Sequence, residues 1–111
     1  MWDVSAVTDM GALFAYLTYF NGNVTMWDTS SVVNMRGMFQ FAYIFNQDIS
    51  GWAVSQVTDM DIMFSNSKAF FQDISAWTSS GTNRNMWADS YMLDNSGCNA
   101  NSGPSCTAGI V

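Results

Sequence analysis

The chain has 111 residues, of which 49% are hydrophobic, and its five Trp and eight Phe are sufficient for the core of one domain. All nine acidic residues are Asp, three residues are basic and His is absent, so the formal charge is −6 at pH 7. Such a field repels phosphate groups, and neither nucleic acid nor an anionic membrane is expected as a partner. No apolar run approaches the ~20 residues of a membrane span, so membrane insertion is not expected.

Tryptophan recurs every 25 residues, at positions 2, 27, 52 and 77. The apolar columns that recur with it are Val7, Val32 and Val57; Met10, Met35 and Met60; Phe14, Phe39 and Phe64; Phe20, Phe45 and Phe70; and Val24, Ile49 and Ile74. Such a register is typical of a protein in which one supersecondary unit stacks on copies of itself. Because Met1 takes the repeat position of Met26 and Gly51, we expect the sequence to begin inside an array whose earlier repeats and targeting segment lie outside it.

Each repeat shows two kinds of apolar pattern. Residues 49–57 predict a short strand, because alternate side chains, Trp52 among them, are apolar. Residues 57–67 carry apolar side chains at three- and four-residue steps, typical of about two helical turns, with Asp59 as a helix N-cap. The sequence therefore predicts an α/β fold, a right-handed solenoid of 25-residue strand and short-helix repeats that is leucine-rich-repeat-like, over residues 1–76.

After Trp77 the register fails and the composition turns to Ser, Asn and Gly. The last unit of a repeat array must cover the core without a successor, so residues 77–111 are predicted to form a degenerate terminal repeat and a C-terminal cap. Cys98 and Cys106 are the only cysteines and enclose a short loop, which predicts a disulfide, with two free thiols as the alternative. A disulfide indicates an oxidising compartment, and the glycosylation sequon at Asn23 agrees with secretion.

A family resemblance covers residues 2–76 and is carried by WDTSSVVNMRGMFQFAYIFNQDIS and FNQDISGWAVSQVTDMDIMF. These segments resemble the 25-residue repeat of the BspA-type leucine-rich-repeat surface proteins of bacteria, mycoplasmas and marine protists. The segment from Met92 to Cys106 is similar to the closing segment of protist members. The resemblance implies a secreted or surface-attached protein of adhesion and recognition, without catalytic residues. Ala53 and Phe71 depart from the family pattern at predicted surface or turn positions.

Two sets of outward residues are candidates for an interaction surface. The polar set is Asp3, Ser5, Asp28, Ser30 and Ser55, and the apolar set is Tyr16, Phe41 and Phe71. Packing does not require the polar set to repeat, which favours binding, although hydrogen bonds from Asp and Ser to turn amides explain the recurrence equally well. Large exposed aromatics on an acidic chain often mark interaction sites.

Catalysis is not expected, because His is absent and the Asp residues recur with the repeat instead of gathering at one place. No cofactor or metal site is expected either, since Asp48 and Asp73 lack a calcium-loop pattern and suit a turn better. The expected function is therefore non-enzymatic recognition or adhesion at a cell surface or outside the cell, with protein or glycan as partner and an organelle lumen as the alternative location. Two other functions stay open. One is a structural subunit that contacts neighbouring subunits of a large extracellular or lumenal assembly, and the other is an ice-binding protein with a rank of Ser hydroxyls.

Overall fold

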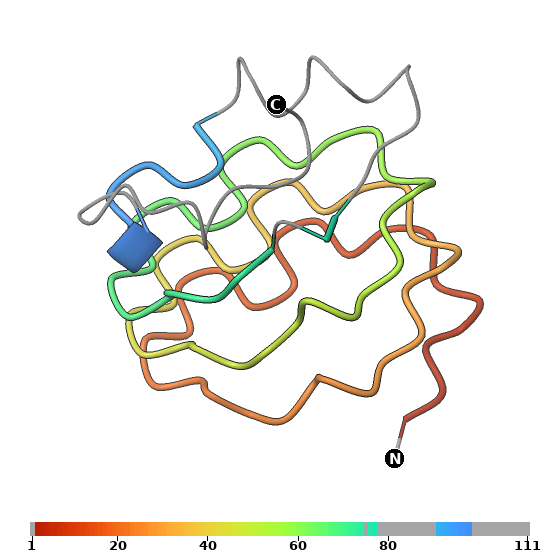
Figure 1. The fold of residues 1–111 in the computed structure, drawn as a ribbon, viewed down its shortest axis with the longest axis horizontal. Helices are drawn as coiled ribbons and strands as arrows, with labels where there is room; N and C mark the ends of the chain where they lie inside the picture. The colour runs from red at the N-terminus through yellow and green to blue at the C-terminus, as the bar shows by residue number, and fades with distance from the viewer. Residues whose placement is uncertain (1, 75, 78–90, 99–111) are drawn as a thin grey trace.

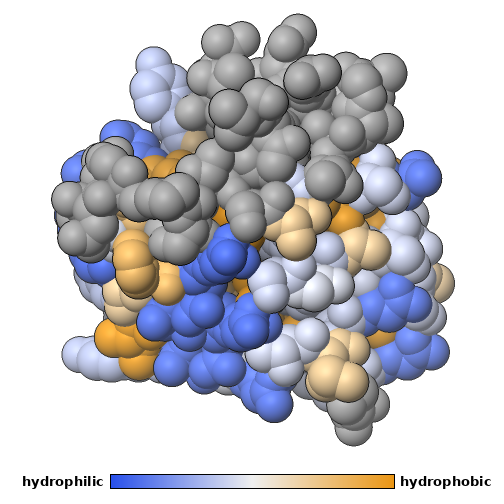
Figure 2. Space-filling model, viewed as in Figure 1, coloured by the Kyte–Doolittle hydropathy of each residue, from blue (hydrophilic) through white to orange (hydrophobic). Residues whose placement is uncertain are grey.

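The computed structural model describes residues 2–74, 76–77 and 91–98. In this part the chain passes through three successive repeats that begin at Trp2, Trp27 and Trp52, and equivalent segments of neighbouring repeats lie side by side (Figure 1). On the face drawn in Figure 2, hydrophobic side chains gather along the left edge, where the repeats reverse direction in Figure 1. Within the described residues, no helix has the length and apolar character needed to cross a membrane.

The backbone of residues 35–42 shows how one repeat is joined to the next. The N–H of Phe39 donates to the carbonyl of Met63 in the third repeat at 2.9 Å, whereas the N–H of Gln40 donates to the carbonyl of Gly37 in its own repeat at 3.1 Å. This alternation continues along the segment and also joins the first repeat to the second. Every second N–H therefore leaves the local chain, which is the pattern of neither an α-helix nor a β-ladder.

Two positions of every repeat have a left-handed backbone. The first position holds Ala12, Gly37 and Ile62, with φ of 56°, 62° and 53°, and the second holds Tyr16, Phe41 and Asn66, with φ of 65°, 60° and 61°. A left-handed residue interrupts both helical and extended geometry. The chain consequently advances through this segment as a series of turns.

The predicted α/β solenoid, with a strand and a short helix in each repeat, is wrong. Among the described residues the strand-type pairs are two isolated parallel bridges, Asp9 with Asn34 and Asn34 with Asp59, and helical geometry is confined to residues 97–98. The predicted helix N-cap begins a turn instead, since Asp59 Oδ1 accepts the N–H of Asp61 at 3.0 Å. Successive turns also bring every third or fourth side chain inward, so they reproduce the apolar period that indicated a helix.

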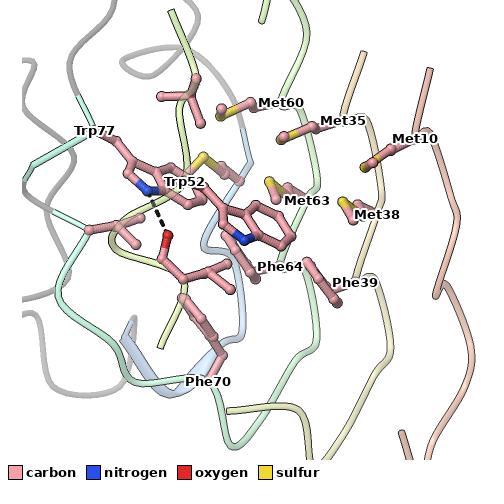
Figure 3. Close-up of a cluster of buried hydrophobic side chains, with 14 of the residues drawn as sticks. Met10, Met35, Met38, Phe39, Trp52, Met60, Met63, Phe64, Phe70 and Trp77 are labelled. Atoms are coloured by element: carbon pink, nitrogen blue, oxygen red, sulfur yellow. Dashed lines mark hydrogen bonds between the residues drawn. The ribbon is translucent and has the colours of Figure 1, made fainter. Parts of the chain in front are cut away.

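The core is built from the apolar columns that the 25-residue spacing predicted, and Figure 3 shows them as parallel rows of Met, Phe and Trp. The second repeat supplies five members of these columns, each with 0% of its surface exposed: Val32, Met35, Phe39, Phe45 and Ile49. The ring of Phe39 stacks between those of Phe14 and Phe64, at centroid distances of 5.4 and 5.6 Å. The inward assignment of these columns is confirmed for the second and third repeats, whereas Val7, Phe14 and Phe20 of the first repeat are only partly buried.

In the tryptophan column, Trp52 and Trp77 each add a buried hydrogen bond to an earlier repeat. Trp52 is 4% exposed, and its indole N–H donates to the carbonyl of Val24 at 3.0 Å. Trp77 repeats the bond to the carbonyl of Ile49 at 3.0 Å, as the dashed line in Figure 3 shows. Trp27 stacks on Trp52 but lies only partly buried, and its indole N–H makes no hydrogen bond with the described residues.

Residues 91–98 cover the third repeat in the way that the repeats cover one another. Phe64 donates its N–H to the carbonyl of Met92 at 2.8 Å, and Asn66 donates to that of Asp94 at 2.9 Å. The segment therefore continues the pattern after a longer connection than the 25-residue spacing predicts. The rest of the predicted cap, residues 78–90 and 99–111, lies outside the described residues.

Candidate recognition surface

The outward Asp and Ser residues form closed turns. Asp28 Oδ1 accepts hydrogen bonds from the N–H of Ser30 at 3.0 Å and from its hydroxyl at 2.6 Å, and Asp3 binds Ser5 with the same two distances. The hydroxyl of Ser30, followed by its N–H, holds the pKa of Asp28 below the ordinary value of 3.8. Turn formation thus accounts for the recurrence of these polar residues. From the sequence alone, this explanation and a binding role were equally supported.

The same turn occurs at two positions outside the polar set. Asp48 Oδ1 accepts the N–H and the hydroxyl of Ser50 at 3.1 and 2.7 Å, which gives Asp48 the turn role favoured over calcium binding. Asn23 Oδ1 accepts the same two groups of Thr25 at 3.1 and 2.7 Å, so the turn contains the sequon, whose glycosylation stays a prediction. Ser55 is exposed, but its repeat has Ala where the others have the Asp acceptor.

The apolar candidates Tyr16 and Phe41 come together where the repeats reverse direction. Their rings stack with centroids 4.9 Å apart and planes at 14°, and Tyr43 packs edge-on against Phe41 at 6.1 Å. Tyr19 and Ile44 occupy equivalent positions three residues further along, with 88% and 44% of their surfaces exposed. These five residues are called the aromatic corner below.

The aromatic corner combines fixed ring geometry with exposure. Tyr16 has 64% of its surface exposed although its ring is stacked, so stacking on Phe41 does not hide it from solvent. In Figure 2 the hydrophobic side chains at the left edge border a strip of hydrophilic residues. An apolar surface rimmed by polar groups is typical of interaction sites.

The third apolar candidate, Phe71, belongs to a different part of the repeat. It takes the column of Asn21 and Asn46, in which each Oδ1 accepts the backbone N–H of the next residue in the column at 2.9 Å. Phe71 therefore ends an asparagine ladder, and its side chain is 45% exposed. None of the ring contacts of the aromatic corner involves Phe71 in the described part of the chain. The structure separates this candidate from Tyr16 and Phe41.

The first repeat also has an aromatic recess, formed largely by residues that the sequence assigned to the buried core. An apolar recess of about 280 Å³ is lined by Trp2, Phe14, Phe20, Gly22, Asn23, Val24 and Trp27. Trp2 is 76% exposed, whereas Trp52 in the same column is 4% exposed. Within the described residues a repeat packs against Trp2 on one side only, and the apolar character of Trp2 does not by itself bury it.

The predicted cysteine bridge falls only partly within the described residues. Cys98 is 2% exposed, and no free cysteine is present in this part of the chain. Cys106 lies outside the described residues, so its pairing with Cys98 stays a prediction.

Comparison with known proteins gives one family match. A family model described as "Mycoplasma protein of unknown function, DUF285" matches residues 1–101. No curated protein and no solved structure matches the chain significantly. A family without a known function leaves the geometry of the surface as the main guide to what the protein does.

Proposed function

We propose that this chain, which belongs to the DUF285 family of Mycoplasma proteins of unknown function, is a non-enzymatic recognition protein that binds protein or glycan partners outside the cell or at its surface. The aromatic corner is the observation that carries this proposal. The resemblance of the repeats to BspA-type surface proteins supports the same class of function and the same location.

The chemistry of the aromatic corner suits recognition. Tyr16, Tyr19 and Tyr43 each combine a flat apolar ring with a hydroxyl that can donate and accept hydrogen bonds. Such side chains lose little conformational entropy on binding, because only two torsions must be fixed. The stack of Tyr16 on Phe41 orders both rings before a partner arrives, which lowers that cost further. The charge of −6 favours neutral or basic partners over anionic ones.

The polar columns support this choice over ice binding. The hydroxyls of Ser5 and Ser30 already donate to Asp3 and Asp28 at 2.6 Å, so they are not free to order water as donors. Two of the three Ser hydroxyls that motivated the ice-binding alternative are therefore already bonded within the turns.

The proposal is tested by replacing the stacked rings without disturbing the backbone. Asn occupies the same left-handed position as Tyr16 and Phe41 at Asn66, so Tyr16→Asn with Phe41→Asn keeps the turn geometry. We expect the double variant to lose binding of the labelled chain to a glycan array and to a panel of purified extracellular matrix proteins. Phe71→Asn, which restores the asparagine column, is the matched control and should retain binding. Retained binding by the double variant, or loss in the control alone, contradicts the assignment to the aromatic corner.

A further inference from the structure

The asparagine ladder holds the side chain of Asn21 between two donors of the second repeat. Asn21 Oδ1 accepts the backbone N–H of Asn46 at 2.9 Å and the Nε2 group of Gln47 at 3.1 Å. The same Nε2 group donates to the backbone carbonyl of Asn21 at 3.0 Å. Both carbonyl oxygens of Asn21 therefore lie against N–H donors, which stabilise any negative charge that develops on them.

The residue after Asn21 is a glycine, in the only Asn–Gly pair of the sequence. Gly22 has no side chain to obstruct its backbone nitrogen, and its N–H donates to none of the described residues. The backbone N–H groups of Gln47 and Gln72, at the equivalent positions of the next two repeats, likewise have no acceptor in this part of the chain. Each of those two repeats follows another repeat, so the exposed nitrogen does not depend on where the sequence begins.

We propose that Asn21 is a site of spontaneous modification, at which the backbone nitrogen of Gly22 displaces the side-chain amide. Hydroxide removes the N–H proton of Gly22, and the resulting charge is shared with the backbone carbonyl oxygen of Asn21, to which Gln47 donates. The nitrogen then forms a bond to Cγ of Asn21. Negative charge moves to Oδ1, where Asn46 and Gln47 already donate, as the donors of an enzyme oxyanion hole do.

The reaction is completed by water. The bond between Cγ and Nδ2 of Asn21 breaks, and ammonia leaves with a proton taken from water, which restores the hydroxide. The cyclic imide that remains is opened by water at either of its carbonyl groups. Opening at Cγ gives Asp with an unchanged main chain, whereas opening at the backbone carbonyl gives isoaspartate, in which the main chain runs through Cγ.

The two products differ in their effect on the ladder. Asp keeps an oxygen that can accept both donors, whereas isoaspartate lengthens the main chain by an atom and displaces the acceptor from Asn46. Isoaspartate therefore weakens the contact between the first and second repeats. The site lies outside the aromatic corner, so this inference is independent of the proposed recognition function.

The chain contains its own matched control at Asn46. Asn46 Oδ1 accepts the backbone N–H of Phe71 at 2.9 Å and the Nε2 group of Gln72 at 3.0 Å, but Gln47 follows Asn46 in place of a glycine. The folded 111-residue chain is incubated at mildly alkaline pH, and peptide mass spectrometry measures Asp and isoaspartate at both positions. We expect modification of Asn21 to be at least about tenfold faster than that of Asn46.

Two variants separate the contribution of the glycine from that of the donors. Gly22→Gln supplies the residue that the next two repeats have at this position, and it should lower the rate at Asn21 to that at Asn46. Gln47→Gly places a glycine after Asn46 and removes the Nε2 donor from Asn21. We expect modification to appear at Asn46 in this variant, and the rate at Asn21 to fall by at least about threefold.

The outcomes that overturn the proposal follow from the same measurements. An Asn21 that stays unmodified in the original chain, or one that reacts no faster than Asn46, overturns it. A rate at Asn21 that is unchanged or higher in Gln47→Gly, with that variant folded by circular dichroism, overturns it as well, because the reaction would then owe nothing to the ladder.

Discussion

Replacing Trp52 by Phe should lower the free energy of unfolding by about 2–3 kcal/mol. The indole N–H of Trp52 donates to the carbonyl of Val24, whose loss removes a net contribution of about 0.5–1.5 kcal/mol. That carbonyl keeps the backbone N–H of Trp27 at 3.2 Å, so the larger penalty of an orphaned buried group does not apply. The smaller ring leaves unfilled space beside Phe39, which costs about 1–2 kcal/mol at a site that is 4% exposed.

Trp27→Phe is the matched control, because Trp27 lies in the same column, is only partly buried and has no indole hydrogen bond within the described residues. It should cost about 1 kcal/mol or less. Urea unfolding followed by far-ultraviolet circular dichroism gives both values without relying on Trp fluorescence. If the two variants lost equal stability, the buried indole bond would contribute nothing and the reasoning would fail. Hydrogen exchange offers a second check, since the indole proton of Trp52 should be protected and that of Trp27 should exchange quickly.

Three further outcomes are expected. Gly37→Ala should cost about 1–2 kcal/mol in a urea titration, because φ at Gly37 is 62°, whereas Gly51→Ala, with no positive φ and an open site, should be neutral or slightly stabilising. The pKa of Asp28 should lie below 3.8 by NMR and rise toward that value in Ser30→Ala. Because this folded-state pKa is depressed, the associated stability is present above about pH 4 and is lost as the pH falls through the folded-state pKa. Intact mass after alkylation of the native protein should show no free thiol, and two alkylated cysteines would contradict the predicted disulfide.

The 25-residue spacing predicted the core but not the secondary structure. Columns such as Met35, Phe39 and Phe45 are buried because equivalent residues of neighbouring repeats pack on one another whatever the local backbone does. The strand and the helix were wrong because left-handed residues are hard to anticipate from side-chain type. Gly37 suggests such a turn, but Phe41 and Ile62 normally avoid one.

The candidate surface was predicted in part. Exposed aromatics were expected, and the structure brings Tyr16 and Phe41 together, because positions one repeat apart lie side by side. The open recess beside Trp2 was missed, because the periodic spacing assigned every member of the tryptophan column to the core. Met92 covers the third repeat although it falls outside the 25-residue register, and no periodic search would have found it.

The alternating hydrogen bonds also align peptide dipoles along the direction in which the repeats stack. Along residues 10–16 and 35–41, the peptide groups that join successive repeats, such as Phe14 to Met38 and Phe39 to Met63, point their N–H groups away from the first repeat, whereas Val33 and Thr58 donate theirs back toward it. Aligned peptide dipoles add, as they do in a helix. Each of these two segments therefore has a dipole along the direction in which the repeats stack, with its carbonyl ends toward the first repeat, and the opposite bonds of Val33 and Thr58 offset part of it.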